Sequence, residues 1–313
     1  MYSDTHFHFE HTICRNSPEN PVNGSEILEK MAANNCFFGL DIGTESDDLL
    51  KRQACVDNAI AQIKDTRLAD KARKFIYFAA AIWPSVEEIK NRHKSMEILK
   101  KQIEAAENSN DNDTLNRKII AVGECGLDHH WNPSGADGRC ESDFDQEMYS
   151  AERELFEMQL EFAKEKKLPV IIHSRDAFED TLDCIKNIGY DNGIIHCYSY
   201  DAEEAKAFLE RGWHISFSGS VTYTKKRKMP EIEELINLVP DERILCETDS
   251  PYLAPVPFRG KTNTPLLIEQ TYRFISEIRK VSAEQLCETV DANIKKLFNL
   301  AEQSAHFITP LRL

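Results

Sequence analysis

The sequence lacks long apolar runs and lacks any pairing pattern among its cysteines. No window approaches the roughly 18 apolar residues of a membrane-spanning helix, and the segment MYSDTHFHFE lacks the basic and then apolar layout of a secretory signal. The nine cysteines contain no CxxC pair, and Cys125, Cys197 and Cys246 lie inside apolar segments. These features predict a cytoplasmic protein without membrane association, with reduced core thiols and no structural zinc cluster.

The sequence also lacks net positive charge, because its formal net charge is −15 at pH 7. Long-range attraction to phosphate requires a positive potential, so this composition excludes nonspecific binding to nucleic acids or anionic membranes. A polyanionic substrate would therefore need local cations or bound metal. The 41% hydrophobic and 29% charged residues are typical of a globular protein.

Eight short apolar segments alternate with stretches of helical periodicity such as AERELFEMQLEFAKEKK and AEEAKAFLERG. Strands separated by helices pair in parallel, and eight strands close a (β/α)8 TIM barrel. We therefore expect residues 1–313 to form a single α/β domain of this kind. The predicted strands are Tyr2–His8, Cys36–Ile42, Phe75–Ile82, Ile119–Gly123, Pro169–His173, Gly193–His196, His214–Phe217 and Ile244–Glu247.

An open doubly wound sheet is the competing fold. It requires a glycine-rich phosphate loop near the first strand, and this sequence has none there. Two polar insertions, NSNDNDTLN and NPSGADGRCESDFDQ, are expected to be loops, and the second is expected to border the substrate site. The segment SAEQLCETVDANIKKLFNL predicts an amphipathic helix on the barrel exterior, in which Asn293 has a structural role.

Histidines and carboxylates gather at the carboxyl ends of the predicted strands, where a TIM barrel carries its active site. In an extended strand His6 and His8 point to the same side. Each residue alone also has an ordinary structural explanation, as a buried histidine or a helix-capping acid. Together these groups would be costly to bury unpaired, and divalent cations would satisfy them. The full set is His6, His8, Glu124, His173, His196 and Asp249.

Mixed imidazole and carboxylate ligands suit Zn, Mn, Fe or Co, and Mg remains possible if water completes the coordination. Two such metals can share a carboxylate and lower the pKa of a water, which then serves as a nucleophile near neutral pH. The pattern therefore predicts a hydrolase.

The segments DTHFH, VGECGLD, LPVIIHSRDAFEDTL, GIIHCYS and ETDSPYLAPVPFRGKTNTP occur in this order. Together they resemble the TatD family of metal-dependent deoxyribonucleases, a branch of the amidohydrolase-like TIM barrels, over nearly the whole chain. The resemblance implies two divalent metal ions (Mg, Mn, Zn or Co) and assigns their ligands: His6, His8 and Asp249 for the first, His173 and His196 for the second, and Glu124 as the bridge.

The resemblance further implies that Glu124 and Asp249 position or deprotonate the attacking water. The implied reaction is hydrolysis of DNA phosphodiester bonds, commonly as a 3′ to 5′ exonuclease on single-stranded DNA or 3′ ends, with no obligate protein partner. Lys225, Arg259 and Lys261 follow the last two predicted strands and are the expected substrate contacts. The run KKRK that begins at Lys225 is equally consistent with a solvated surface.

The sequence departs from the family pattern after the third strand. It reads AIWP where the family carries glycine, any residue, histidine and proline, so Trp83 stands in place of that histidine. Trp83 is either a packing residue or a stacking surface for a base. His129 and His130, just beyond the fourth strand, are not assigned as metal ligands.

Two other functions stay open at this point. The same two-metal barrel can hydrolyse a non-nucleic ester, lactone or amide, because the fold and the metal site do not determine the substrate. A noncatalytic metal-binding interaction protein would have lost at least one ligand, and none is missing from the motifs.

Overall fold

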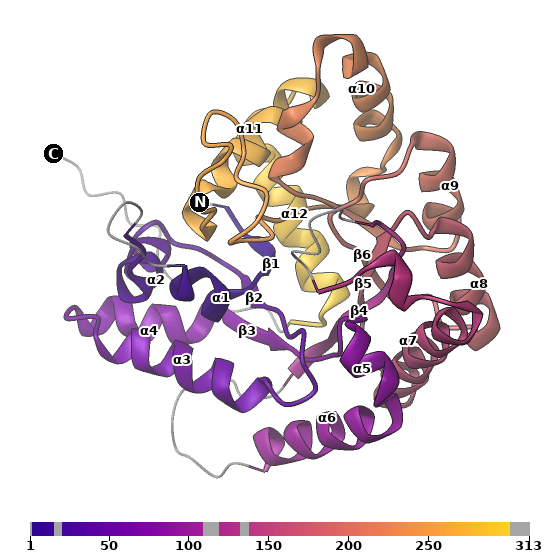
Figure 1. The fold of residues 1–313 in the computed structure, drawn as a ribbon. Coiled ribbons are helices and arrows are strands. Elements are labelled where there is room, and N and C mark those ends of the chain that lie inside the picture. Colours follow the sequence, from indigo (N-terminus) through magenta and orange to yellow (C-terminus); the bar gives the residue numbers. More distant parts are fainter. Residues whose placement is uncertain (1, 16–20, 109–118, 132–137, 301–313) are drawn as a thin grey trace, which may run out of the picture.

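The computed structural model describes residues 2–15, 21–108, 119–131 and 138–300. Its strands form one eight-stranded parallel sheet in the order β1 to β8, and Figure 1 shows helices arranged around these strands. The strands are β1 (Asp4–Phe7), β2 (Gly39–Asp41), β3 (Ile76–Ala79), β4 (Ile119–Asp128), β5 (Val170–Arg175), β6 (Gly193–Ile195), β7 (His214–Phe217) and β8 (Ile244–Cys246).

The sheet closes between its first strand and the segment after its last strand. The Asp249 amide donates to the His6 carbonyl at 2.9 Å, and the His8 amide donates to the Ser250 carbonyl at 2.8 Å. Phe7 and Ser250 form a parallel bridge at the same place. The predicted (β/α)8 TIM barrel is therefore confirmed.

The helices follow the strands and cover the outside of the sheet (Figure 1). Short 3-10 helices η1 (Glu141–Asp143), η2 (Gly219–Tyr223), η3 (Lys226–Lys228), η4 (Asp241–Arg243) and η5 (Pro265–Leu267) interrupt the loops. The α-helices are α1 (Phe9–Cys14), α2 (Gly24–Ala33), α3 (Leu49–Ala61), α4 (Thr66–Phe75), α5 (Val86–Lys90), α6 (Arg92–Glu107), α7 (Gln146–Lys166), α8 (Phe178–Ile188), α9 (Ala202–Glu210), α10 (Met229–Leu238), α11 (Ile268–Arg279) and α12 (Ala283–Leu297). In the part of the chain that the structure describes, none of these helices is long and apolar enough to cross a membrane.

Local capping explains why the last helix begins where it does. The Ser282 side chain accepts from the Gln285 amide at the start of α12, and the Gln285 side chain accepts in return from the Ser282 amide. Further along, the Asn293 side-chain amide donates to the carbonyls of Asp241 and Ile244 at 2.7 and 2.9 Å. Asn293 thus ties the helix to the start of β8, which is the structural role that the sequence predicts.

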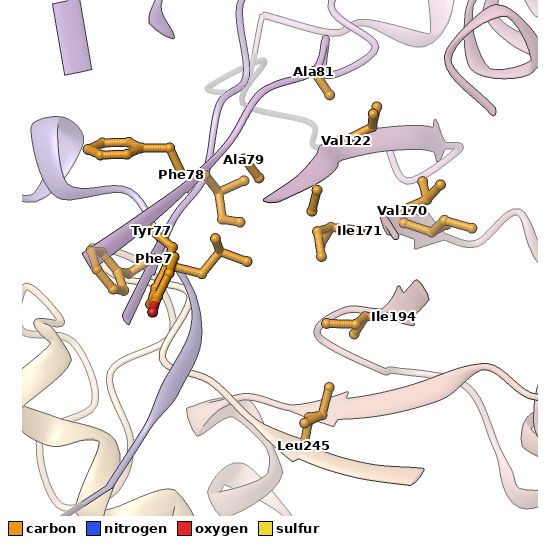
Figure 2. Packing of buried hydrophobic residues seen from close by; sticks show 14 of the residues in the cluster. Phe7, Tyr77, Phe78, Ala79, Ala81, Val122, Val170, Ile171, Ile194 and Leu245 are labelled. Carbon is orange, nitrogen blue, oxygen red and sulfur yellow. The ribbon is translucent and has the colours of Figure 1, made fainter. Parts of the chain in front are cut away.

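The core fills the barrel and the space between the strands and the helices. Most strand residues are buried on both faces, which explains why the strands appear in the sequence as continuous apolar segments. Figure 2 shows buried hydrophobic side chains from several strands that belong to one core cluster, including Phe78, Val122, Ile171, Ile194 and Leu245.

A buried ion-pair cluster ties β2 to α3. The Arg52 guanidinium lies 3.2 Å from an Asp41 carboxylate oxygen and 2.9 Å from one of Asp48, and it donates to the Ala79 carbonyl at 2.8 Å. Because all three charged groups are nearly inaccessible to solvent, each depends on the others for compensation.

The strand boundaries differ from the prediction in both directions. β4 and β5 run further, to Asp128 and Arg175, and these two residues are partners in the ladder. Gly126 allows this extension, because with φ +150° a Cβ at this position would lie 1.8 Å from the His173 carbonyl oxygen. β1, β2, β3, β6 and β8 are shorter than predicted, and His8 and His196 therefore follow their strands directly instead of ending them.

The two polar insertions are described only in part. Of the predicted loop NSNDNDTLN, the structure describes Asn108 alone, at the end of α6. Residues 132–137 of the second insertion lie outside the described residues, whereas its remainder forms η1 and the approach to α7.

Candidate metal centre

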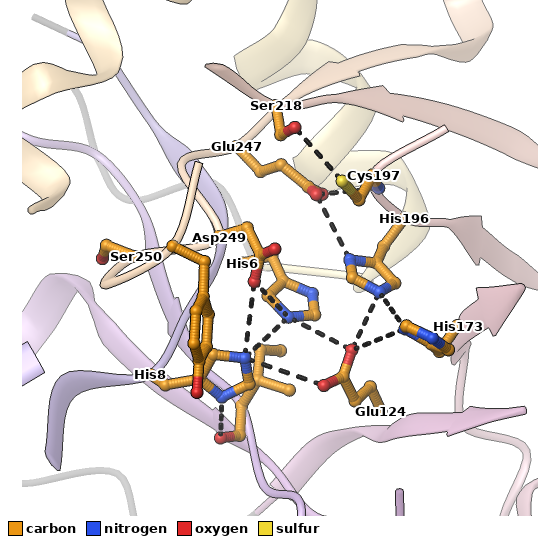
Figure 3. A network of polar contacts seen from close by, with 12 residues as sticks. His6, His8, Glu124, His173, His196, Cys197, Ser218, Glu247, Asp249 and Ser250 are labelled. Atoms are coloured by element: carbon orange, nitrogen blue, oxygen red, sulfur yellow. Dashed lines mark hydrogen bonds and ion pairs between the residues drawn. The ribbon is translucent and has the colours of Figure 1, made fainter. Parts of the chain in front are cut away.

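The six predicted ligands lie together at the carboxyl end of the barrel, with Glu124 in the middle (Figure 3). Glu124 Oε2 lies 2.8 Å from His196 Nε2, 3.5 Å from His6 Nε2 and 3.7 Å from His173 Nδ1. Glu124 Oε1 points to the other side, 3.7 Å from His8 Nε2. The two oxygens of one carboxylate therefore face different histidines, as a bridging ligand requires.

Asp249 closes the His8 side of the cluster. Its Oδ1 lies 3.5 Å from His8 Nε2 and 3.7 Å from His6 Nε2. Among the described residues, two sets of three have ligand atoms within 4.8 Å of one another, namely His6 with Glu124 and His196, and His6 with His8 and Asp249. His173 belongs to neither set, although its Nδ1 lies 3.7 Å from Glu124 Oε2. Since His6 belongs to both sets, the geometry groups it with either metal position, whereas the resemblance assigns it to the first alone.

The donor atoms are arranged for cations. His6 Nε2 and His8 Nε2 face each other at 3.3 Å, and His173 Nδ1 and His196 Nε2 face each other at 3.2 Å. A facing pair of ring nitrogens can share at most one proton. Glu124 Oε2 is buried and makes no hydrogen bond of good geometry with any residue that the structure describes. Bound divalent cations would satisfy all of these atoms at once.

The outward ring nitrogens of three histidines are held by acceptors. His196 Nδ1 donates to Glu247 Oε1 at 3.2 Å, His173 Nε2 to Asp128 Oδ2 at 3.0 Å, and His8 Nδ1 to the Ile42 carbonyl at 3.1 Å. These contacts orient each ring and leave the inward nitrogen as the one that can bind a metal in place of a proton. His8 and His196 therefore present Nε2 to the centre, and His173 presents Nδ1.

Sequence reasoning missed the two carboxylates behind these histidines. Asp128 and Glu247 both lie inside the quoted motifs, as the last residue of VGECGLD and the first of ETDSP. Glu247 is completely buried and also accepts from the Cys197 amide at 2.8 Å. An acidic residue inside a ligand motif was the sequence signal for this role. The histidine that each acid contacts could be identified only from the fold.

Glu124 carries negative charge at the middle of the centre. Burial alone would raise the pKa of Glu124, but His196 and His6 hold this pKa well below its usual value. Burial opposes a charge on His196, yet Glu124 raises the pKa of His196 well above normal. Burial, together with His196, holds the pKa of His6 well below normal. Glu124 is therefore an anion whose field favours cations around it.

The loop after β8 is held in the shape that presents Asp249. Asp249 has a left-handed backbone with φ 54°, a conformation that aspartate tolerates better than most residues. The preceding Thr248 donates through its amide and hydroxyl to the Asp4 carboxylate at 2.9 and 2.7 Å, and the Asn263 amide donates to the Thr248 carbonyl at 2.8 Å. Asp249 is thus positioned by residues of the first strand and of the last motif.

The predicted substrate contacts lie outside this cluster, on exposed loops. The Arg259 guanidinium lies 4.4 Å from the centre of the Tyr223 ring, and Lys261 lies 5.9 Å from that of Phe258. Lys225 borders a cavity of about 590 Å³ beside α9 and α10, which contains none of the six ligands. The roles of these three cations stay predictions.

The other residues near the fourth strand have separate partners. His129 Nε2 contacts Glu152 at 3.1 Å, and His130 Nδ1 contacts Asp176 at 2.8 Å. Neither histidine belongs to the two ligand sets. The Trp83 ring lies at the edge of the centre, with its centroid 5.9 Å from that of His173.

The chain is similar to known metal-dependent hydrolases. The family model described as TatD related DNase matches residues 3–299. The uncharacterized metal-dependent hydrolase YabD of Bacillus subtilis is 33% identical over 238 residues, which cover 75% of this chain and 83% of YabD. The uncharacterized metal-dependent hydrolase YcfH of Escherichia coli K12 is 34% identical over 184 residues, covering 58% of this chain and 63% of YcfH.

Solved structures show the same barrel. The crystal structure of YjjV, a TatD homologue from Escherichia coli K12, matches with a TM-score of 0.72 and 25% identity, covering 96% of this chain and 98% of YjjV. A TatD family hydrolase from Entamoeba histolytica matches in fold with a TM-score of 0.69 and 17% identity, covering 95% and 97% of the two chains. With a family match over nearly its whole length, the chain belongs to the TatD related DNase family of metal-dependent hydrolases.

Proposed function

We propose that this protein is a deoxyribonuclease that uses two divalent metal ions and a metal-activated water to hydrolyse DNA phosphodiester bonds, as a 3′ to 5′ exonuclease. The observation that carries this proposal is the arrangement around Glu124, whose two carboxylate oxygens face His8 on one side and His173 and His196 on the other. This arrangement suits two metals that share one carboxylate.

The residues of the chain have separate tasks in this reaction. Divalent cations (Mg, Mn, Zn or Co) bound by these residues would supply a water of lowered pKa and positive charge for the phosphoryl oxygens. Glu124 would contribute one carboxylate oxygen to each metal position, because its two oxygens face different histidines. Asp249 has a side chain that is 13% exposed, compared with 7% for Glu124, so it is the more accessible carboxylate. It is therefore placed to accept the proton of the attacking water from the substrate side.

Exposed cations on the loops support a phosphate-containing substrate. Lys225 lies between η2 and η3 after β7, and Arg259 and Lys261 lie on the loop after β8, so all three are on loops at the carboxyl end of the barrel, which is the end that carries the centre. Against a formal net charge of −15, such local cations are needed for any polyanion to approach.

The test is hydrolysis of 5′-labelled and 3′-labelled single-stranded DNA by chelator-stripped protein, with Mg, Mn, Zn or Co added back. The Glu124→Gln variant is the matched control, because it keeps the shape of the side chain and removes the bridging charge. Metal-dependent cleavage by the wild type that is lost in the variant would support the proposal, and the two labels would give the direction. Full activity of Glu124→Gln would contradict the two-metal mechanism. No cleavage with any metal would redirect the search to ester, lactone and amide substrates.

The proposed phosphate contacts have their own test. Lys225→Ala and Arg259→Ala should each weaken DNA binding and each reduce the slope of log affinity against log salt by about 0.7, the value for one contact to a single strand. Lys186→Ala, which removes an exposed lysine on α8, is the control. Unchanged affinity and slope in both variants would show that these residues do not contact phosphate.

A further inference from the structure

Two aromatic rings stand at different ends of the metal centre. The Trp83 ring lies 5.9 Å from the His173 ring at an angle of 76°, and the Tyr252 ring lies 6.0 Å from the His8 ring at 75°. His173 and His8 face different oxygens of Glu124, as Figure 3 shows. Each ring therefore lies beside a different one of the two proposed metal positions.

Both rings reach solvent, whereas three of the candidate ligands are nearly inaccessible. His6, His8 and His196 have side chains that are at most 4% exposed, whereas Tyr252 is 40% exposed. From Ala79, the last residue of β3, to Ile82 the chain is fully buried, and Trp83 is the next residue and is partly exposed. The most accessible ligand side chains are those of Asp249 and His173. Asp249 lies three residues before Tyr252 in the sequence, and the His173 ring lies beside the Trp83 ring. A substrate that reaches the centre from solvent therefore meets the two rings.

An arginine lies against each ring. The guanidinium carbon of Arg139 lies 5.6 Å from the centre of the Trp83 ring, and Arg139 itself is fully buried and paired with Glu152 at 2.9 Å. The guanidinium carbon of Arg15 lies 4.8 Å from the centre of the Tyr252 ring. A ring held beside an arginine offers a rigid stacking surface, and the exposed Arg15 near Tyr252 also adds attraction for an anionic strand.

We propose that Trp83 and Tyr252 are stacking platforms for two unpaired bases, one on each side of the phosphodiester that is cleaved. This inference rests on the proposed function, because a phosphodiester held between the two metal positions has one nucleoside toward His173 and one toward His8. Trp83 receives the first base and Tyr252 receives the second. The substrate class that follows is a single strand or a frayed end, since bases inside a duplex have both faces covered by their neighbours.

The experiment compares single-stranded oligonucleotides that carry one abasic residue, at either the terminal or the penultimate position of the cleaved end. The protein is the metal-loaded full chain, and kcat/KM is measured for the wild type and for Trp83→Ala, Tyr252→Ala, Trp83→Phe and Tyr252→Phe. Loss of one stacked base should lower the wild-type value roughly 5- to 150-fold at each position. Trp83→Ala should remove this preference at one position and Tyr252→Ala at the other, while the phenylalanine variants keep both preferences.

Three results would overturn the inference. The first is equal wild-type cleavage of normal and abasic substrates, which would leave the nuclease function intact and remove the stacking role. The second is a uniform decrease on all substrates in the alanine variants, which would indicate a structural role, and thermal melting with metal analysis would identify it. The third is no wild-type cleavage of any oligonucleotide, which would reject the proposed function and the platforms together.

Discussion

Replacing Glu247 with glutamine should weaken metal binding at the His196 side of the centre while leaving the fold in place. Glutamine has the same shape as glutamate and keeps an oxygen that can accept from the Cys197 amide, which now lies 2.8 Å from Glu247 Oε1. The change therefore removes chiefly the charge that Glu247 places behind His196 Nδ1, at 3.2 Å. A neutral acceptor makes the imidazole a weaker electron donor toward a metal at Nε2.

The magnitude follows from the type of hydrogen bond. A hydrogen bond to a charged acceptor contributes about 1.5–3 kcal/mol, and one to a neutral acceptor about 0.5–1.5 kcal/mol. The difference of about 1–1.5 kcal/mol corresponds to a loss of roughly 5- to 12-fold in affinity. Loss of a partner of a metal-binding histidine typically lowers metal affinity by about 10- to 100-fold, and the expected loss lies near the lower end of that range. Glu247 is completely buried, so solvent does not screen the effect.

The assay is competition between the chelator-stripped protein and a chromophoric chelator, titrated with one metal at constant pH. Glu233→Gln is the control, because Glu233 is exposed on α10 and its replacement changes the net charge equally. We expect one weakened site in Glu247→Gln and two unchanged sites in Glu233→Gln. Wild-type affinity at both sites in Glu247→Gln would refute the view that this carboxylate tunes His196. Equal weakening of both sites would refute the view that Glu247 affects only the metal position beside His196.

Three stability predictions follow from buried groups. Arg52→Met should lower the free energy of unfolding by about 3–5 kcal/mol, since it leaves two buried carboxylates uncompensated. Arg67→Met, at an exposed pair, should leave urea unfolding almost unchanged. Gly126→Ala should cost more than about 3 kcal/mol because of its positive φ and backbone contact, whereas Gly189→Ala, with open space around its Cβ, should cost about 1 kcal/mol in the same assay. Burial raises the pKa of Asp291 from 3.8 to about 6, so the folded state binds this proton more tightly than the unfolded state. The wild type should therefore lose up to about 3 kcal/mol relative to Asp291→Asn as the pH rises from about 4 to about 7, and a constant difference between the two proteins across that range would contradict this.

The sequence by itself determined the architecture and the candidate metal ligands. Eight apolar segments separated by helical periodicity indicate a parallel barrel, because strand and helix repeats are local properties of the chain. In such a barrel the carboxyl ends of all strands meet at one rim. Residues as distant as His6 and Asp249 are therefore expected together from their positions at strand ends alone. The boundaries of β4 and β5 were missed because their extension depends on the close approach at Gly126 to the His173 carbonyl, which is a contact between two strands.

Only the tertiary structure decided how each ligand is presented. His173 directs Nδ1 to the centre and His196 directs Nε2, and the difference comes from Asp128 and Glu247, which lie 45 and 51 positions away from them in the chain. The placement of the Trp83 and Tyr252 rings beside different histidines was likewise visible only in space. Residue type and spacing determine which chemistry is available at a strand end. The ring nitrogen that a histidine offers, and the side chains that border it, depend on packing between distant segments, which no local pattern encodes.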